Sequence, residues 1–250
     1  MQREFLVTST LASQAPAAVG RALSIPWSNY LLKKEAKFDA GAISLVSVGE
    51  GSINNAHFLS AMNLAKYSSF NGIKCPVVFL VTDNGYSISL KDKGWSSRFV
   101  SDLEPSMLVE TADGDSFLDI FEKSKKVIDY SRQLSRPSLL LVKNLPRRFG
   151  HAATDRQSAY MDANELQTVL SRNPLSATIA SSIQLGIISA IEFETLFHDL
   201  SEMVENAFDA ASVEPKISSR DKLIASNSQS KVSLRSSGGV AIASTSAPTG

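Results

Sequence analysis

The sequence predicts an α/β protein with an open, mostly parallel sheet, helices on both faces, a helical C-terminal part and a flexible tail. Three short runs, residues 42–48, 76–81 and 138–142, are apolar over most of their length. Such runs are typical of parallel strands that are covered on both faces. Helical patterns alternate with them, and this alternation favours right-handed crossovers and a parallel sheet.

Two amphipathic patterns place helices between these strands. Behind the first strand, apolar residues recur at the spacing i, i+3, i+4 and i+7, at Phe58, Ala61, Met62 and Ala65. The same spacing returns before the third strand, at Phe117, Ile120, Phe121 and Ser124. Residues at this spacing share one helix face, so we expect both sets to face the core.

The strand patterns stop after Tyr160, and helices follow. Asp162 and Glu165 have the spacing of an N-terminal capping box. A longer amphipathic helix follows, with an apolar face for core or subunit packing that holds Phe193, Leu196, Phe197, Leu200, Ala207 and Phe208. From about Ser226 the chain is rich in Ser, Ala, Gly and Thr, a composition that cannot bury enough surface to order itself. We therefore expect one domain over residues 1–215 and a linker or tail over residues 216–250.

Composition excludes several classes of protein. Lys and Arg number 25 and so do Asp and Glu, so the chain lacks the basic footprint of a nucleic-acid binder. No apolar run is long enough to span a bilayer, and we expect no membrane partner. A single cysteine, Cys75, excludes an internal disulfide framework and a multi-cysteine zinc site. The chain starts without a secretory signal pattern, in what resembles mid-domain sequence, so we expect the natural protein to extend upstream.

The first strand leads into a turn that suits a bound phosphate. Gly49, Glu50, Gly51 and Ser52 lie between the strand and the next helix. Glycines let a backbone approach phosphate closely, and a helix N-terminus supplies amide donors. An acidic residue there would repel a diphosphate unless it held a bridging divalent cation. A dinucleotide fingerprint is the competing interpretation, but it needs glycine where this chain has Asn54.

The second strand ends in Asp83-Asn84-Gly85-Tyr86-Ser87-Ile88-Ser89. Parallel strands that lie side by side end at the same edge of the sheet, where ligands of such folds bind. Glu50 and Asn84 should therefore converge there as oxygen ligands suited to magnesium.

Together these two motifs resemble the thiamine diphosphate motif of the alpha-type subunits of 2-oxo acid dehydrogenases, with the branched-chain (2-oxoisovalerate) type the most similar. The resemblance implies thiamine diphosphate and Mg²⁺ as cofactors, with Glu50, Asn84 and the Tyr86 carbonyl as metal ligands. It places Gly49, Gly51 and Ser52 against the diphosphate. Upstream, Ser9 and Leu11 match the segment that supports the bent cofactor.

A second match follows the third strand, where Arg147 opens a loop that contains Gly150-His151-Ala152 and ends in Ser158-Ala159-Tyr160. The resemblance implies that Arg147 and His151 lie at the cofactor and that His151 is catalytic, orienting the 2-oxo acid and assisting acyl transfer. Imidazole suits this role because it both donates and accepts protons near neutral pH. Kinase-regulated members carry serine after this histidine, so Ala152 predicts that this switch is absent.

The implied function is oxidative decarboxylation of a branched-chain 2-oxo acid with acyl transfer to lipoyl groups. The implied partners are a beta-type pyrimidine-binding domain or subunit, which supplies the other half of the cofactor site, and a lipoyl acyltransferase core. The implied location is the mitochondrial matrix in a eukaryote and the cytoplasm otherwise. Two alternatives stay open at this point, a pyruvate dehydrogenase-type component and a non-catalytic truncated subunit.

Overall fold

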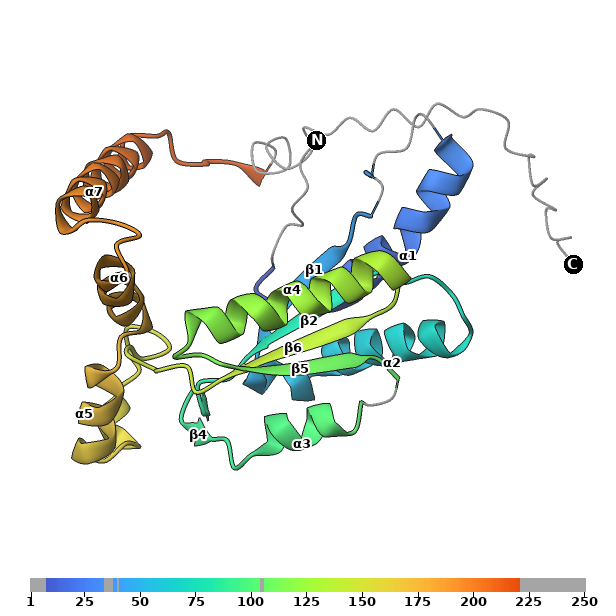
Figure 1. Cartoon of the computed structure of the whole chain (residues 1–250), viewed down its shortest axis with the longest axis horizontal. Coiled ribbons are helices and arrows are strands. Elements are labelled where there is room, and N and C mark those ends of the chain that lie inside the picture. The colour runs from blue at the N-terminus through green and yellow to red at the C-terminus, as the bar shows by residue number, and fades with distance from the viewer. Residues whose placement is uncertain (1–7, 34–37, 40, 104–105, 221–250) are drawn as a thin grey trace, which may run out of the picture. The chain divides into compact units, whose positions relative to one another are not determined.

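The computed structural model describes residues 8–33, 38–39, 41–103 and 106–220. The chain divides into two compact units, residues 1–187 and residues 188–250, and each is described by itself. Strands and helices of the first unit alternate along the chain (Figure 1).

A four-stranded parallel sheet forms the centre of the first unit. Its spatial order is β1 (Ser44–Gly49), β2 (Val77–Thr82), β6 (Ser138–Lys143) and β5 (Leu108–Asp113). Gly49 pairs with Thr82, Thr82 with Val142, and Val142 with Ala112. All four strands therefore end at one common edge, and the predicted parallel α/β sheet is confirmed.

The three predicted strands lie within two residues of their observed bounds, but the fourth, β5, was not predicted. Among the described strands β1 and β5 form the sides of the sheet, and both are only partly covered. On β1 buried and exposed residues alternate, and Leu45 is 60% exposed. The expectation that the first strand is covered on both faces was therefore wrong, whereas the central strands β2 and β6 are almost wholly buried.

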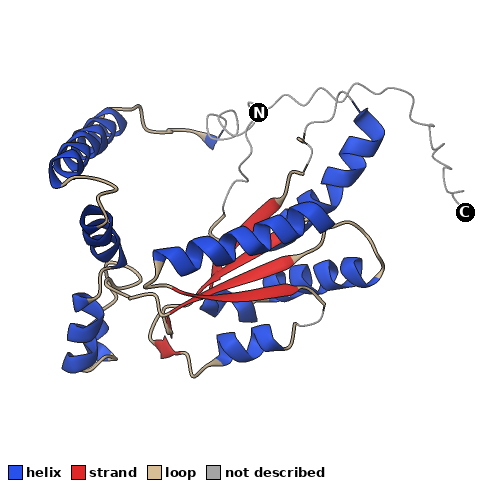
Figure 2. Cartoon of the chain, in the orientation of Figure 1, coloured by secondary structure: helices blue, strands red, loops and turns tan. Residues whose placement is uncertain are grey.

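Helices cover both faces of the sheet (Figure 2). On one face α1 (Gln14–Leu32) and α2 (Ala56–Phe70) pack together. The residues Phe58, Ala61, Met62 and Ala65 are all buried there, as the spacing predicted. Cys75 is buried in the same cluster. The short helix α3 (Trp95–Ser101) follows the second strand.

Helix α4 (Phe117–Leu134) covers β5 and β6 on the other face. It presents Val127 and Ser131 to the sheet, and the Ser131 hydroxyl lies 2.8 Å from that of Ser138. Phe117 and Phe121 are each 58% exposed. The predicted apolar face of this helix was therefore wrong for its two aromatic residues, whereas Ile120 of the same face packs against the core.

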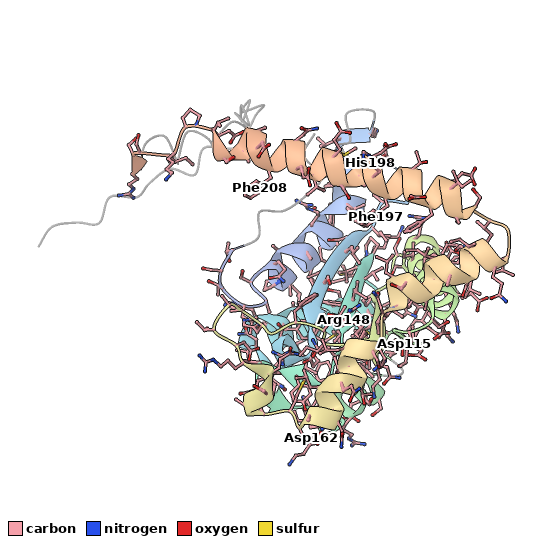
Figure 3. All side chains as sticks on the ribbon, turned by 90° about the vertical axis from the view of Figure 1, so that its left-hand side faces the viewer. Asp115, Arg148, Asp162, Phe197, His198 and Phe208 are labelled. Carbon is pink, nitrogen blue, oxygen red and sulfur yellow. The ribbon has the colours of Figure 1, made fainter. Side chains whose placement is uncertain are left out.

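Two helices end the first unit, α5 (Ala163–Ser171) and α6 (Pro174–Gln184). In the second unit α7 (Ala190–Ser212) begins with a complete capping box between Ser189 and Glu192. Phe197 and Phe208 of its apolar face are labelled in Figure 3. None of the described helices combines the length and the apolar character that crossing a membrane requires. Most of the predicted tail, residues 221–250, lies outside the described residues.

Candidate cofactor site

Glu50 and Asn84 meet at the common edge where the strands end. Glu50 directly follows β1 and opens the short 3₁₀ helix η2 (Glu50–Asn54), while Asp83 and Asn84 follow β2. The backbone N–H of Asn84 lies close enough to the Glu50 carboxylate to lower its pKa. The sheet therefore brings these two predicted ligands together, although they lie far apart in the chain.

The Glu50 carboxylate is buried among like charges. Its residue is 6% exposed, and within the described part of the chain it forms no ion pair. Burial raises the pKa of Glu50, and the carboxylates of Asp83 and Asp92 raise it further, against backbone N–H donors that lower it. A buried carboxylate without a counter-charge fits a bound cation, and its hard oxygen suits Mg²⁺.

Amide and carbonyl oxygens would have to complete such a site. The described residues contain no cluster of three or more His, Cys, Asp or Glu side chains arranged for a metal. The Asn84 side chain is exposed, and its Oδ1 accepts a hydrogen bond from the Tyr86 N–H at 3.0 Å. Asp83 is turned elsewhere, since it accepts bonds from the Gly85 N–H at 2.8 Å and the Ser96 hydroxyl at 2.5 Å.

The Gly-Glu-Gly turn is held by close packing. A Cβ on Gly51 would lie 2.6 Å from Ser87 Oγ and 2.9 Å from Ser87 Cβ, whereas one on Gly49 would meet nothing within 4 Å. Gly51 therefore makes room for the Tyr86–Lys91 hairpin of β3 (Tyr86–Ser87) and β4 (Leu90–Lys91). Ser52 is also buried. The predicted contact of this turn with diphosphate stays a prediction.

The segment before α1 lies near the end of β1. Gln14, the first residue of α1, donates a hydrogen bond to the Ser47 carbonyl at 3.3 Å. Ser9 and Leu11 precede this point, and Leu11 is 56% exposed. No hydrogen bond among the described residues joins Ser9 to the Glu50 turn. The predicted role of Ser9 and Leu11 in supporting the cofactor stays a prediction.

Arg147 ties the histidine loop to the hairpin. Its residue is 7% exposed, and its guanidinium donates to Asp155 Oδ2 at 2.5 Å and to the Ile88 carbonyl. The same group lies over the rings of Tyr86 and Tyr160, at 5.6 Å and 5.3 Å from their centroids. Because protein groups already engage this guanidinium, a contact of Arg147 with the diphosphate stays a prediction.

His151 lies on the loop that the Arg147–Asp155 ion pair closes. Its backbone N–H donates to Asp155 Oδ2 at 2.6 Å, and the residue itself is exposed. The His151 N–H, together with the Tyr160 hydroxyl and Arg147, lowers the pKa of Asp155. A Cβ on Gly150 would lie 2.6 Å from the Asp155 carbonyl oxygen. Glycine at this position therefore lets the loop close under the histidine.

Glu165, on helix α5, has a different side-chain partner from the one that the sequence pattern predicted. Asp162, labelled at the start of α5 in Figure 3, accepts the Glu165 N–H at 2.8 Å and so caps the helix as predicted. The Glu165 side chain does not return to the cap. Its Oε1 accepts the Tyr86 hydroxyl and the Lys91 ammonium, both at 2.7 Å. The capping-box interpretation was therefore half wrong, because a tertiary contact takes the carboxylate.

Two cavities open beside these residues. One, of about 420 Å³, is lined by Asn84, Tyr86, Arg147 and Glu165 among others. The other, of about 270 Å³, is lined by Glu50, Gly51, Asn54 and Trp95 among others. Lys91 and Asp92 line both cavities. The Tyr86–Lys91 hairpin therefore lines both cavities, at the edge where the parallel strands end.

Sequence reasoning missed a contact that braces the turn. The Trp95 indole N–H donates to Asn54 Oδ1 at 2.7 Å, and Asp92 Oδ1 accepts the Trp95 N–H at 2.8 Å. Trp95 therefore joins the start of α3 to the end of η2. Nothing in the local sequence signals this contact, since it joins residues 41 positions apart.

Comparison with known proteins yields one family. The sequence profile of the family described as dehydrogenase E1 component matches residues 2–219. The alpha subunit of acetoin:2,6-dichlorophenolindophenol oxidoreductase from Cupriavidus necator is 28% identical, over 85% of this chain and 60% of that protein. The 2-oxoisovalerate dehydrogenase alpha subunit of Bacillus subtilis is 27% identical, over 83% and 59%.

A third relative carries a different substrate in its name. The pyruvate dehydrogenase E1 component alpha subunit of Rickettsia conorii is 24% identical, over 76% of this chain and 57% of that protein. The chain thus spans no more than 60% of the length of these three relatives.

Proposed function

This chain belongs to the dehydrogenase E1 component family, and from that premise we propose that it is the alpha-type, diphosphate-binding part of a thiamine-diphosphate-dependent 2-oxo acid dehydrogenase. One observation carries the proposal. The buried Glu50 carboxylate has no ion pair within the described chain and lies beside the Asn84 backbone, at the edge where ligands of parallel sheets bind.

The residues present suit magnesium and a diphosphate. Glu50, the Asn84 side chain and the Tyr86 carbonyl would hold the metal, and Gly49, Gly51 and Ser52 would lie against the phosphates. When bound, thiamine diphosphate supplies the carbon centre at which a 2-oxo acid loses carbon dioxide. The protein binds and orients the cofactor and keeps its metal ligands in place.

His151 would act as the proton donor and acceptor on the substrate side. Its exposed position leaves the imidazole accessible, while the bond from its N–H to Asp155 holds the backbone. An imidazole held in this way can orient a 2-oxo acid and pass a proton during acyl transfer. Ala152, which follows it, cannot be phosphorylated.

A branched-chain 2-oxo acid is the proposed substrate, with pyruvate as the alternative. The 2-oxoisovalerate type is supported by the motif resemblance and by one of the relatives, and the pyruvate type by another. The acetoin enzyme adds a third chemistry to the group. A beta-type domain and a lipoyl acyltransferase are the proposed partners, in the mitochondrial matrix of a eukaryote or otherwise in the cytoplasm.

The proposal is tested by calorimetry of thiamine diphosphate binding in the presence of Mg²⁺. This chain is compared with Glu50→Ala and with Glu50→Asp, which keeps a carboxylate on a shorter stem, each with and without a beta-type partner. We expect binding that needs Mg²⁺, is lost in Glu50→Ala and is partly kept in Glu50→Asp. No binding by the unaltered chain under any condition refutes the cofactor assignment and favours a non-catalytic subunit.

A further inference from the structure

We propose that Glu165, on helix α5, is a positioning residue for the magnesium site. It holds the side chain of Tyr86 and thereby fixes the backbone that carries the ligands Asn84 and Tyr86. This inference rests on the proposed function. It adds a residue outside the two motifs that resemble the cofactor site, 79 positions from Tyr86 along the chain.

A single carboxylate oxygen holds both strands of the hairpin. Glu165 Oε1 lies 2.7 Å from the Tyr86 hydroxyl and 2.7 Å from Lys91 Nζ. Tyr86 and Lys91 are paired across the two strands. The hairpin is therefore fixed at its base by one side chain from α5, which is 27% exposed.

Tyr86 is buried, so its hydroxyl depends on this acceptor. The residue is 8% exposed, with the Tyr160 ring 5.6 Å away and the Arg147 guanidinium over its face. A buried hydroxyl left without its acceptor carries the full cost of lost solvation. Loss of Glu165 therefore favours movement of Tyr86 toward water.

Movement of Tyr86 would reach the metal ligands directly. The Tyr86 N–H donates to Asn84 Oδ1 at 3.0 Å, and the Asn84 backbone N–H lies close enough to the Glu50 carboxylate to lower its pKa. The Tyr86 backbone therefore helps to hold Asn84 beside Glu50. Glu165 in turn holds the hydroxyl of Tyr86.

Helix α5 is itself well anchored, which lets it serve as a fixed support. Asp162 caps its first turn, and Arg172, which follows its last turn, donates from Nε to Asp115 Oδ2 at 2.9 Å. Arg172 also bonds the Asn144 carbonyl after β6. The helix is thereby capped at its start and bonded at its end to residues that follow β5 and β6.

The test measures Mn²⁺ binding by the loss of the free-ion electron paramagnetic resonance signal. It uses the full chain together with its beta-type partner and thiamine diphosphate. Five variants are compared: Glu165→Ala, Glu165→Gln, Tyr86→Phe, the double variant Tyr86→Phe/Glu165→Ala, and Glu110→Ala. Glu110 is the matched control, because its carboxylate also binds two side chains, those of Lys123 and Lys126, but lies on β5 away from the ligands.

We expect Glu165→Ala to weaken Mn²⁺ binding by about tenfold. Tyr86→Phe should weaken it in the same direction, and the double variant should be no weaker than Glu165→Ala, since both changes remove the same Tyr86–Glu165 hydrogen bond. Glu165→Gln keeps an acceptor for the hydroxyl and should restore most of the affinity. Glu110→Ala should leave Mn²⁺ binding unchanged.

The outcomes separate this inference from the function on which it rests. If the unaltered chain binds Mn²⁺ and Glu165→Ala binds it equally well, the positioning role is wrong and the cofactor assignment stands. If the unaltered chain binds neither Mn²⁺ nor the cofactor, both fall together. Should Glu165→Ala fail to fold, Tyr86→Phe decides the question, because it removes only the hydroxyl, and unchanged Mn²⁺ affinity there overturns the inference.

Discussion

The guanidinium of Arg147 and the carboxylate of Asp155 form a buried ion pair, 2.5 Å between Nη2 and Oδ2, that closes the loop carrying His151. Both side chains are less than a tenth exposed. The same Asp155 oxygen accepts the His151 N–H, and the same guanidinium donates to the Ile88 carbonyl. One pair thus links the proposed catalytic histidine to the hairpin that carries Tyr86.

Replacing Asp155 by Asn should therefore destabilise the chain and loosen the loop. The change is nearly isosteric, but it leaves the buried Arg147 guanidinium without its counter-charge, which is costly in a protein interior. We expect a lower unfolding midpoint in urea and faster proteolysis within residues 147–160. An exposed acidic control, Asp102→Asn, should leave both unchanged.

The pH dependence of this loss has a definite sign. The pKa of Asp155 is lowered from its ordinary 3.8, chiefly by the His151 N–H. The pair therefore stabilises the fold above that pH, and the stabilisation is lost as the pH falls through the lowered pKa. The difference between the unaltered chain and Asp155→Asn should shrink in acid, and a constant difference down to pH 2 would contradict this account.

Gly51→Ala should destabilise the first unit by about 1–3 kcal/mol, the usual cost of overpacking. The new Cβ would lie within 3 Å of both Ser87 Oγ and Ser87 Cβ. Urea unfolding measures the loss, and the double variant Gly51→Ala/Ser87→Gly should recover most of it. Gly20→Ala is the control, since its Cβ meets nothing within 4 Å on helix α1 and should be neutral or stabilising.

Ile88 lies at the tip of the hairpin with a φ of +56°, a conformation that a β-branched residue rarely adopts. Ile88→Gly should relieve this strain and, after the entropic cost of glycine, raise stability by about 1 kcal/mol. Its side chain is 54% exposed, so little packing is lost. Ile88→Ala keeps a Cβ and should bring no gain. Equal stability of the two variants would show that the backbone there is not strained.

The sequence was sufficient to predict the strands that are buried on both faces. β2 and β6 are continuous apolar runs, and their predicted bounds lie within one residue of the observed ones. β5 was missed because Glu110 and Asp113 interrupt its apolar pattern. Asp113 is exposed, whereas Glu110 is tolerated because Lys123 and Lys126 of α4 pair with its carboxylate. Helix α1 was missed as well, since Pro26 lies inside it and few local signals mark it.

In the same way, the sequence predicted those contacts of the site that follow from a general rule of the fold and missed those that do not. The convergence of Glu50 and Asn84 followed from the rule that parallel strands end together, and the Asn84 backbone lies close enough to lower the pKa of Glu50. The contacts of Glu165 with Tyr86 and of Trp95 with Asn54 join residues 79 and 41 positions apart. A single sequence offers no periodicity for such pairs. For Glu165 the local spacing favoured the helix cap at Asp162 as the partner of the carboxylate, not Tyr86.

Glu50→Gln should make the metal-free chain more stable at neutral pH, although it removes a proposed metal ligand. Burial, reinforced by the Asp83 and Asp92 carboxylates, raises the pKa of Glu50 above its ordinary 4.5. Between 4.5 and the raised value the folded chain holds a proton that the unfolded chain has lost, so stability falls as the pH rises through this window. Glutamine carries no charge at any of these pH values and escapes the penalty.

The measurement is the thermal midpoint with EDTA from pH 4 to pH 8, followed by a repeat with Mg²⁺, thiamine diphosphate and the partner. Without metal, Glu50→Gln should overtake the unaltered chain as the pH rises. With metal and cofactor the order should reverse, because a cation bound to the Glu50 carboxylate stabilises the folded state by mass action and the amide binds it poorly. If Glu50→Gln is less stable at every pH without metal, the carboxylate stabilises the fold by itself and needs no bound cation.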